Sequence, residues 1–151
     1  MKLGISKIAK TLVFIGFLTI FSALITNYAN AENRYVFKSN SNDQMKIALT
    51  FDDGPHPRKT KRILDVLDKY NVHATFFVIG VNVQNYPNVL ESVIEKGHEL
   101  GNHTFSHQIL KSASVSKIKN EISDTEDALY DRYSLRTNLL RPPCGLYDSN
   151  L

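Results

Sequence analysis

Two short segments of the sequence combine the side chains used by hydrolytic metal sites. Asp52 and Asp53 are adjacent carboxylates in TFDDGP, and His103 and His107 lie four residues apart in HTFSH. Four-residue spacing places two imidazoles on one face of a helical turn. Two histidines and one carboxylate are a common catalytic zinc set that leaves one position for water. Each segment alone is a weak signal, because Asp-Gly and Gly-Pro also form ordinary turns and a four-residue histidine spacing often arises by chance.

The sequence around these segments predicts alternating strands and helices. Strands are expected at 46–51, 74–79, 98–102 and 139–141, and helices at 58–70, 87–96 and 114–133. Alternation of this kind is typical of a parallel α/β sheet or barrel, in which functional residues gather at the carboxyl ends of strands. The aspartates follow the first predicted strand, the histidines follow the third, and Arg141 lies at the end of the fourth. We therefore expect one shared site.

Three motifs in chain order resemble those of the polysaccharide deacetylase family, the NodB homology domain of carbohydrate esterase family four. They are TFDDGP at 50–55, GHELGNHTFSH at 97–107 and RPPCG at 141–145. The resemblance covers residues 46–151 and implies the N-terminal portion of a distorted parallel (β/α) barrel. It also implies removal of acetyl groups from N-acetylglucosamine in peptidoglycan or chitin-like glycans, with one divalent metal, for which zinc is expected.

The resemblance assigns a role to individual residues. Asp52 would be the general base, oriented by Arg141. Pro143 would line the substrate groove, and the backbone N–H of Cys144 would face the oxyanion. Cys144 stands where the family usually has an aromatic residue, so the aromatic groove wall is missing. The implied metal ligands are Asp53, His103 and His107.

The other three histidines are not expected to bind the metal. His98 and Glu99 begin a sequence like HExxH, but the next histidine, His103, lies one residue too far along. We expect His73 and His98 to be structural or surface residues and His56 to lie at the rim of the turn after the aspartates.

The family pattern continues beyond the motifs found in this chain. It includes a Leu-x-His motif whose histidine protonates the leaving amine, and no such motif follows the third segment. A (β/α) barrel typically needs about 250 residues. We therefore expect a C-terminally truncated form that keeps the metal half of the site, with little activity on amides and a bias towards esters. A non-catalytic, membrane-tethered metal- or glycan-binding remnant and a xylan O-acetyl esterase are the alternatives.

Residues 1–31 predict a secretory signal peptide or an N-terminal membrane anchor. A basic start precedes fifteen uncharged residues at 11–25, and Ala29-Asn30-Ala31 matches a signal peptidase site. The polar segment 32–45 is expected to be a linker, followed by the deacetylase domain at 46–151. The domain is therefore expected outside the cytoplasm, secreted or anchored. Membrane contact would be confined to residues 11–28 of an uncleaved signal.

The charge distribution argues against nucleic-acid binding. The chain has 18 basic and 15 acidic residues, and the excess basic residues are Lys2, Lys7 and Lys10. The rest of the chain is therefore neutral and lacks the basic surface that follows a phosphate backbone. The single cysteine, Cys144, excludes an internal disulfide and a cysteine-rich zinc site. The expected partner is an acetylated glycan.

Overall fold

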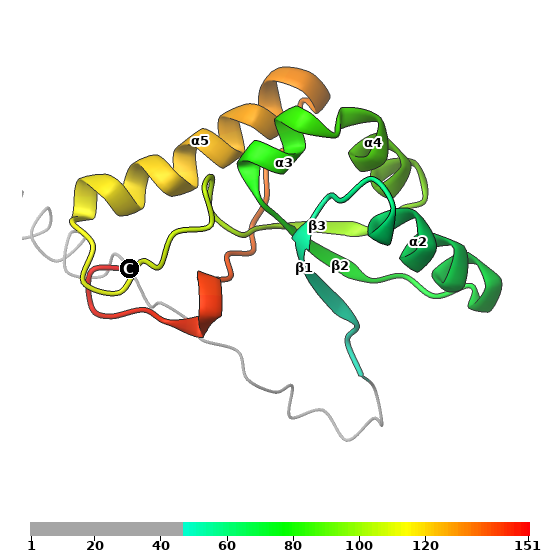
Figure 1. Cartoon of the computed structure of the whole chain (residues 1–151), viewed down its shortest axis with the longest axis horizontal. Coiled ribbons are helices and arrows are strands. Elements are labelled where there is room, and N and C mark those ends of the chain that lie inside the picture. Colours follow the sequence, from blue (N-terminus) through cyan, green and yellow to red (C-terminus); the bar gives the residue numbers. More distant parts are fainter. Residues whose placement is uncertain (1–46) are drawn as a thin grey trace, which may run out of the picture. The chain divides into compact units, whose positions relative to one another are not determined.

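The computed structural model describes residues 47–151, which belong to one compact unit, Met45–Leu151. The predicted signal peptide or anchor at 1–31 and the predicted linker at 32–45 lie outside the described residues. Strands and helices alternate along the described chain, as the sequence predicts (Figure 1). In chain order the elements are β1 (Thr50–Gly54), α2 (Lys59–Tyr70), β2 (Thr75–Val78), α3 (Gly80–Asn85), α4 (Pro87–Glu95), β3 (Glu99–Asn102), α5 (Val115–Tyr133) and the 3₁₀ helix η1 (Pro143–Gly145).

The three strands form a parallel sheet in the order β1-β2-β3. Beyond β3, a single parallel bridge joins Asn102 to Leu140. Two backbone hydrogen bonds flank this bridge, from the N–H of Asn102 to the carbonyl of Leu139 and from the N–H of Arg141 to the carbonyl of Asn102. Because the strands run in one direction, the segments that follow them meet at the carboxyl edge of the sheet.

The hydrophobic core lies between the sheet and the helices. In Figure 1, α3 and α4 lie between α5 and α2. Helix α5 contacts α3, α3 contacts α4, and α4 contacts α2. Burial of an apolar side chain contributes about 1.5–3 kcal/mol, so this core holds the strand ends in place. Its buried side chains include Leu64 and Leu67 from α2, Phe76 and Val78 from β2, Val83 from α3, Leu90 and Val93 from α4, and Leu129 from α5.

Most of the predicted elements are confirmed to within one residue at each end. Helix α5 shows why such patterns are informative. The hydroxyl of Ser114 accepts a hydrogen bond from the N–H of Lys117 and caps the helix start. Ile118 and Leu129 on one face are buried, and Ser134, in the left-handed region, ends the helix.

Four elements differ from the sequence prediction, one of them the 3₁₀ helix η1, which it does not contain. Strand β1 begins at Thr50 and includes both aspartates, whereas the predicted strand at 46–51 ends before them. The reason is that pairing with β2 begins at Thr50. The predicted fourth strand at 139–141 forms only one bridge. Helix α3 is absent from the elements that the sequence predicts. Its first N–H groups, from Gly80 and Val81, donate to carbonyls of the distant segment after β3, which is a contact that local sequence does not reveal.

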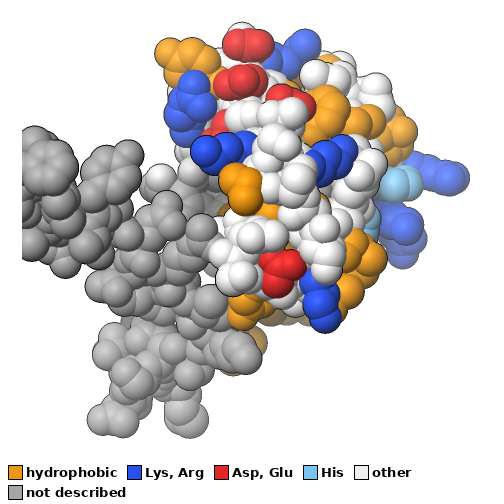
Figure 2. All heavy atoms as spheres, turned by 90° about the vertical axis from the view of Figure 1, so that its left-hand side faces the viewer, with side chains coloured by type: hydrophobic (Ala, Val, Ile, Leu, Met, Phe, Trp, Pro, Cys, Tyr) orange, Lys and Arg blue, Asp and Glu red, His pale blue; other side chains and the backbone are white. Residues whose placement is uncertain are grey.

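The surface agrees with the neutral charge of this part of the sequence. Figure 2 shows acidic and basic side chains interspersed across one face of the described region. Within residues 47–151, no helix combines the length and the apolar character required to cross a membrane.

Candidate metal centre

Both aspartates of the first motif lie inside β1, at an irregularity in the strand. The register of pairing with β2 shifts at these residues, and Asp53 has a φ of 66°. Asn82 of α3 donates its side-chain amide to the carbonyl of Asp53 at 3.1 Å. In a regular strand, successive side chains point to opposite faces. The irregularity instead lets Asp52 contact Arg141 while Asp53 contacts the histidines.

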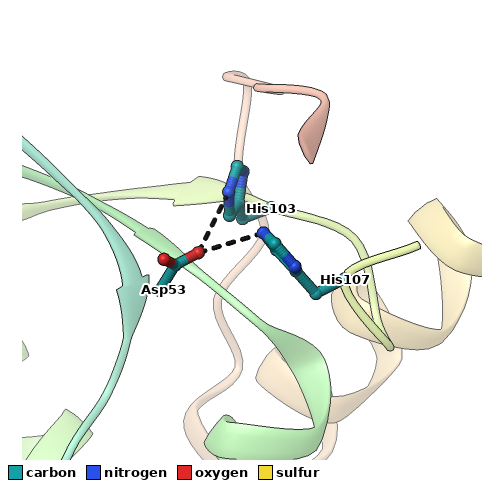
Figure 3. A group of neighbouring side chains, drawn as sticks. All are labelled: Asp53, His103 and His107. Carbon is teal, nitrogen blue, oxygen red and sulfur yellow. Dashed lines mark ion pairs between the residues drawn. The ribbon is translucent and has the colours of Figure 1, made fainter. Parts of the chain in front are cut away.

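Asp53, at the carboxyl end of β1, converges with His103 and His107, which follow β3 (Figure 3). Oδ1 of Asp53 lies 3.4 Å from Nε2 of His103 and 3.1 Å from Nε2 of His107. One ligand atom from each residue lies within 4.8 Å of the other two. The His103 side chain is 3% exposed, whereas those of His107 and Asp53 are 37% and 66% exposed. The cluster is thus anchored on the protein side and open to solvent on the other.

The hydrogen bond of His103 indicates that this cluster suits a cation. Nδ1 of His103 lies 2.7 Å from the backbone carbonyl oxygen of Arg141. Because a carbonyl only accepts, Nδ1 carries a proton, so the nitrogen available for a metal is Nε2, which faces Asp53. Two facing lone pairs repel unless a cation or a proton lies between them. Two imidazole nitrogens and a carboxylate oxygen, with this second hydrogen bond on the ring, fit a divalent metal such as zinc.

Beside this cluster, Asp52 forms an ion pair with Arg141. The guanidinium Nη1 lies 2.7 Å from Oδ1 of Asp52 and also donates to the hydroxyl of Thr50 at 2.9 Å. It stacks over the Phe77 ring at 4.0 Å. Gly101 makes room for that ring, because a Cβ there would lie 2.5 Å from it. Arg141 therefore orients Asp52 from a supported position and, through its carbonyl, also orients His103.

The third motif ends in a tight turn. Pro143 is buried and begins η1, and Cys144 follows with an exposed side chain and a φ of 57°. Among residues 47–151, no hydrogen bond or ion pair joins either residue to the three-residue cluster. The groove role of Pro143 and the oxyanion role of Cys144 stay predictions.

The remaining histidines lie apart from the cluster. Nδ1 of His56 accepts hydrogen bonds from the backbone N–H groups of Arg58 and Lys59 at 3.2 and 3.3 Å, so this ring caps the start of α2. His73 is exposed, whereas His98 is buried and accepts the N–H of Ala74.

Two buried polar residues behind the site are missing from the sequence prediction. Asn102 accepts the N–H of Thr104 and donates to Glu126. Glu121 accepts two hydrogen bonds from Ser106. Burial alone raises the pKa of Glu121, but the hydrogen bonds from Ser106 and the ammonium of Lys117 outweigh it and hold the pKa below its ordinary value. One sequence signal was available, because Glu121 falls on the apolar face of its helix.

Comparison with known proteins decides the family. A family model described as polysaccharide deacetylase matches residues 39–151. The chain belongs to the polysaccharide deacetylase family. This confirms the resemblance carried by the three motifs, and the parallel strands with intervening helices agree with the fold of solved family members. Deacetylases of this family are metal-dependent, which is consistent with the ligand set described above.

Three relatives show how far the similarity extends. The peptidoglycan-N-acetylmuramic acid deacetylase PdaC of Bacillus subtilis is 48% identical over 103 residues, which are 68% of this chain and 22% of that protein. Its solved structure matches with a TM-score of 0.67 and 47% identity over 69% of this chain and 52% of the solved one. A peptidoglycan-N-acetylglucosamine deacetylase of Bacillus cereus is 40% identical over 111 residues, 74% of this chain and 52% of that protein.

The third relative has a different named activity. A family 4 acetyl xylan esterase from Clostridium thermocellum, solved in complex with a cobalt ion, matches with a TM-score of 0.66 and 38% identity. The match covers 69% of this chain and 51% of the esterase chain. This chain therefore spans about half the length of both solved relatives.

Proposed function

We propose that this chain is a divalent-metal-dependent deacetylase that acts outside the cytoplasm on N-acetylglucosamine-containing glycans, with peptidoglycan as the first candidate. The observation that carries the proposal is the convergence of Asp53, His103 and His107 beside the Asp52–Arg141 pair. The choice of peptidoglycan is supported by the activities for which the Bacillus relatives are named. The extracytoplasmic location is supported by the signal-like sequence at 1–31.

The residues of this chain divide the chemistry between them. When bound by Asp53, His103 and His107, a divalent cation supplies a Lewis acid that polarises the acetyl carbonyl and lowers the pKa of water. Asp52 accepts a proton from the attacking water, as a general base. Arg141 keeps that carboxylate aimed at the site. The backbone N–H of Cys144 is assigned to the oxyanion, where one such donor typically contributes about 3 kcal/mol.

Hydrolysis of O-acetyl esters on xylan is the second candidate. The esterase relative from Clostridium thermocellum, 38% identical, favours it. An alkoxide is a better leaving group than an amide nitrogen, so an ester needs less help from a general acid. The same ligands and the same base would therefore serve both substrates.

Acetate release from defined substrates tests the proposal. The full chain, loaded with Zn²⁺ or Co²⁺, is incubated with N-acetylated peptidoglycan, chitotetraose and acetylated xylan. We expect slow release from an N-acetylated substrate, weaker than release from acetylated xylan because the leaving amide nitrogen needs a general acid, and a chelator should abolish it and added metal restore it. Release from xylan alone would assign the esterase activity instead. Metal binding without acetate release from any of the three would contradict both activities and favour the non-catalytic alternative.

A further inference from the structure

The histidine loop, defined as residues 103–107, holds its two imidazoles with an unfavourable backbone. Thr104 has a φ of 68° and His107 a φ of 59°. Side chains with a Cβ rarely adopt this left-handed region, and such conformations persist only where surrounding contacts impose them. The contacts on this loop therefore decide how the two imidazoles are presented to Asp53.

The two ends of the loop are held in different ways. His103 is fixed directly, because its N–H donates to the carbonyl of Val78 at 2.9 Å and its Nδ1 donates to the carbonyl of Arg141 at 2.7 Å. The His107 ring contacts Asp53, but among residues 47–151 no acceptor binds its other nitrogen. The position of His107 thus depends on the backbone that carries it.

Glu121 of α5 binds the residue immediately before His107 with both carboxylate oxygens. Oε2 accepts the backbone N–H of Ser106 at 2.8 Å, and Oε1 accepts its hydroxyl at 2.6 Å. Glu121 is only 4% exposed, and Lys117 lies 3.0 Å from Oε1 and balances the buried charge. We call these two hydrogen bonds from Ser106 to Glu121 the Glu121 clamp. Hydrogen bonds to a carboxylate are short and strong, so the clamp can hold the loop despite the unfavourable positive φ of Thr104 and His107.

We propose that Glu121 is a positioning residue of the metal site, which holds Ser106 against α5 and thereby fixes His107 beside His103 for cation binding. The inference rests on the proposed metal-binding function of Asp53, His103 and His107. Glu121 touches none of these ligands in the contacts described, so it acts through the loop. Residues that support metal ligands from behind typically contribute about 10–100-fold in metal affinity.

The test measures cation affinity and ring geometry separately in the full chain. Affinity is the Kd for Co²⁺ from its visible absorption, in competition with a chelator. Geometry is the nuclear Overhauser effect between the His103 and His107 rings in metal-free protein, where the centroids lie 5.0 Å apart. The variants are Glu121→Ala and the conservative Glu121→Gln. Tyr133→Phe is the control, because it removes another α5 hydrogen bond, to the carbonyl of Pro87.

We expect Glu121→Ala to raise the Kd for Co²⁺ by about 10–100-fold. It should also weaken the nuclear Overhauser effect between the His103 and His107 rings. Glu121→Gln should recover most of the affinity, since its amide oxygen still accepts the Ser106 N–H. Tyr133→Phe should lower the melting temperature but leave the Kd unchanged. Should Glu121→Ala fail to fold, Ser106→Ala is used in its place. It removes one of the two hydrogen bonds to Glu121, so it should raise the Kd by a smaller factor than the loss of both.

Wild-type affinity in folded Glu121→Ala, or in Ser106→Ala when Glu121→Ala does not fold, would overturn the proposal. An equal loss of affinity in Tyr133→Phe would also overturn it, because the effect would then be general destabilisation. If the wild-type chain bound no cation, the proposed function would fail. The nuclear Overhauser effect between the His103 and His107 rings, measured without metal, would still decide whether Glu121 positions His107.

Discussion

Two pairs of histidines lie at opposite ends of the parallel sheet. His103 and His107 follow β3 at its carboxyl end, whereas His73 and His98 precede β2 and β3 at the amino end. The rings are similarly close, with centroids 5.0 Å apart in the first pair and 5.8 Å apart in the second. Ring proximity alone therefore does not distinguish them.

The pairs differ in their partners and in the nitrogen that each ring leaves free. At the carboxyl end, His103 donates from Nδ1 to a carbonyl and turns Nε2 towards Asp53. At the amino end, His98 uses Nδ1 to accept the N–H of Ala74 at 3.3 Å. Its Nε2 is buried without a hydrogen-bond partner among the described residues. Two imidazole nitrogens and a carboxylate oxygen are one common donor set for a catalytic zinc, and among residues 47–151 only the carboxyl-end pair is grouped with a carboxylate in this way.

The largest expected effect is the loss of metal when a ligand is removed. Asp53→Ala, or His103→Ala combined with His107→Ala, should reduce bound metal from about one ion per chain to a trace, because too few ligands remain to hold a catalytic-type ion. Elemental analysis of the purified full chain measures this. His73→Ala is the control at the other end of the sheet and should keep the full metal content. Equal metal in wild type and in the double variant would show that these residues are not the ligands.

A smaller effect separates the two aspartates within the carboxyl end. Asp52→Asn should lower metal-dependent acetate release by about 10²–10⁴-fold, the usual contribution of a general base, and leave the metal content unchanged. Steady-state acetate release and metal analysis are measured on the same sample. The exposed Asp65 of α2 provides the control variant Asp65→Asn. Undiminished acetate release by Asp52→Asn would assign the base to another residue.

The smallest effect concerns the amino-end pair and is a pH dependence of stability. Burial, followed by the neighbouring His73, lowers the pKa of His98 from its ordinary 6.5, with Asp68 opposing and Lys96 adding to the shift. The unfolded chain then binds a proton more readily than the folded one, so the free energy of unfolding decreases as the pH falls below about 6.5. Urea unfolding of the metal-free chain between pH 7.5 and 5.5 measures this slope.

His98→Asn is the matched variant for that measurement, because an asparagine oxygen can replace Nδ1 as the acceptor for Ala74. The variant should show a shallower pH dependence than wild type. An unchanged slope would assign the pH dependence to other groups.

Much of the secondary structure follows from local pattern. The apolar spacing and the Ser114 cap predict α5, and Pro87 predicts the start of α4, because periodicity and capping act within a few residues. Helix α3 could not be predicted in this way, because its first N–H groups bind carbonyls of the histidine loop about 24 residues away in sequence.

For the site, the order of the motifs along the chain predicted one shared site, and the resemblance to the family named the residues expected in it. Asp53, His103 and His107 form the cluster, and Arg141 pairs with Asp52, because parallel strands bring their carboxyl ends to one edge. The predicted orientation was wrong for the histidines: their four-residue spacing predicts one face of a helical turn, whereas residues 103–107 are not helical and Thr104 and His107 have a positive φ. The displaced bulge of β1, the tautomer of His103 and the Glu121 clamp all arise from hydrogen bonds between segments distant in sequence. Residue type and order thus specified the chemistry of this chain, whereas the direction in which each ligand atom points was decided only when the strands and α5 packed together.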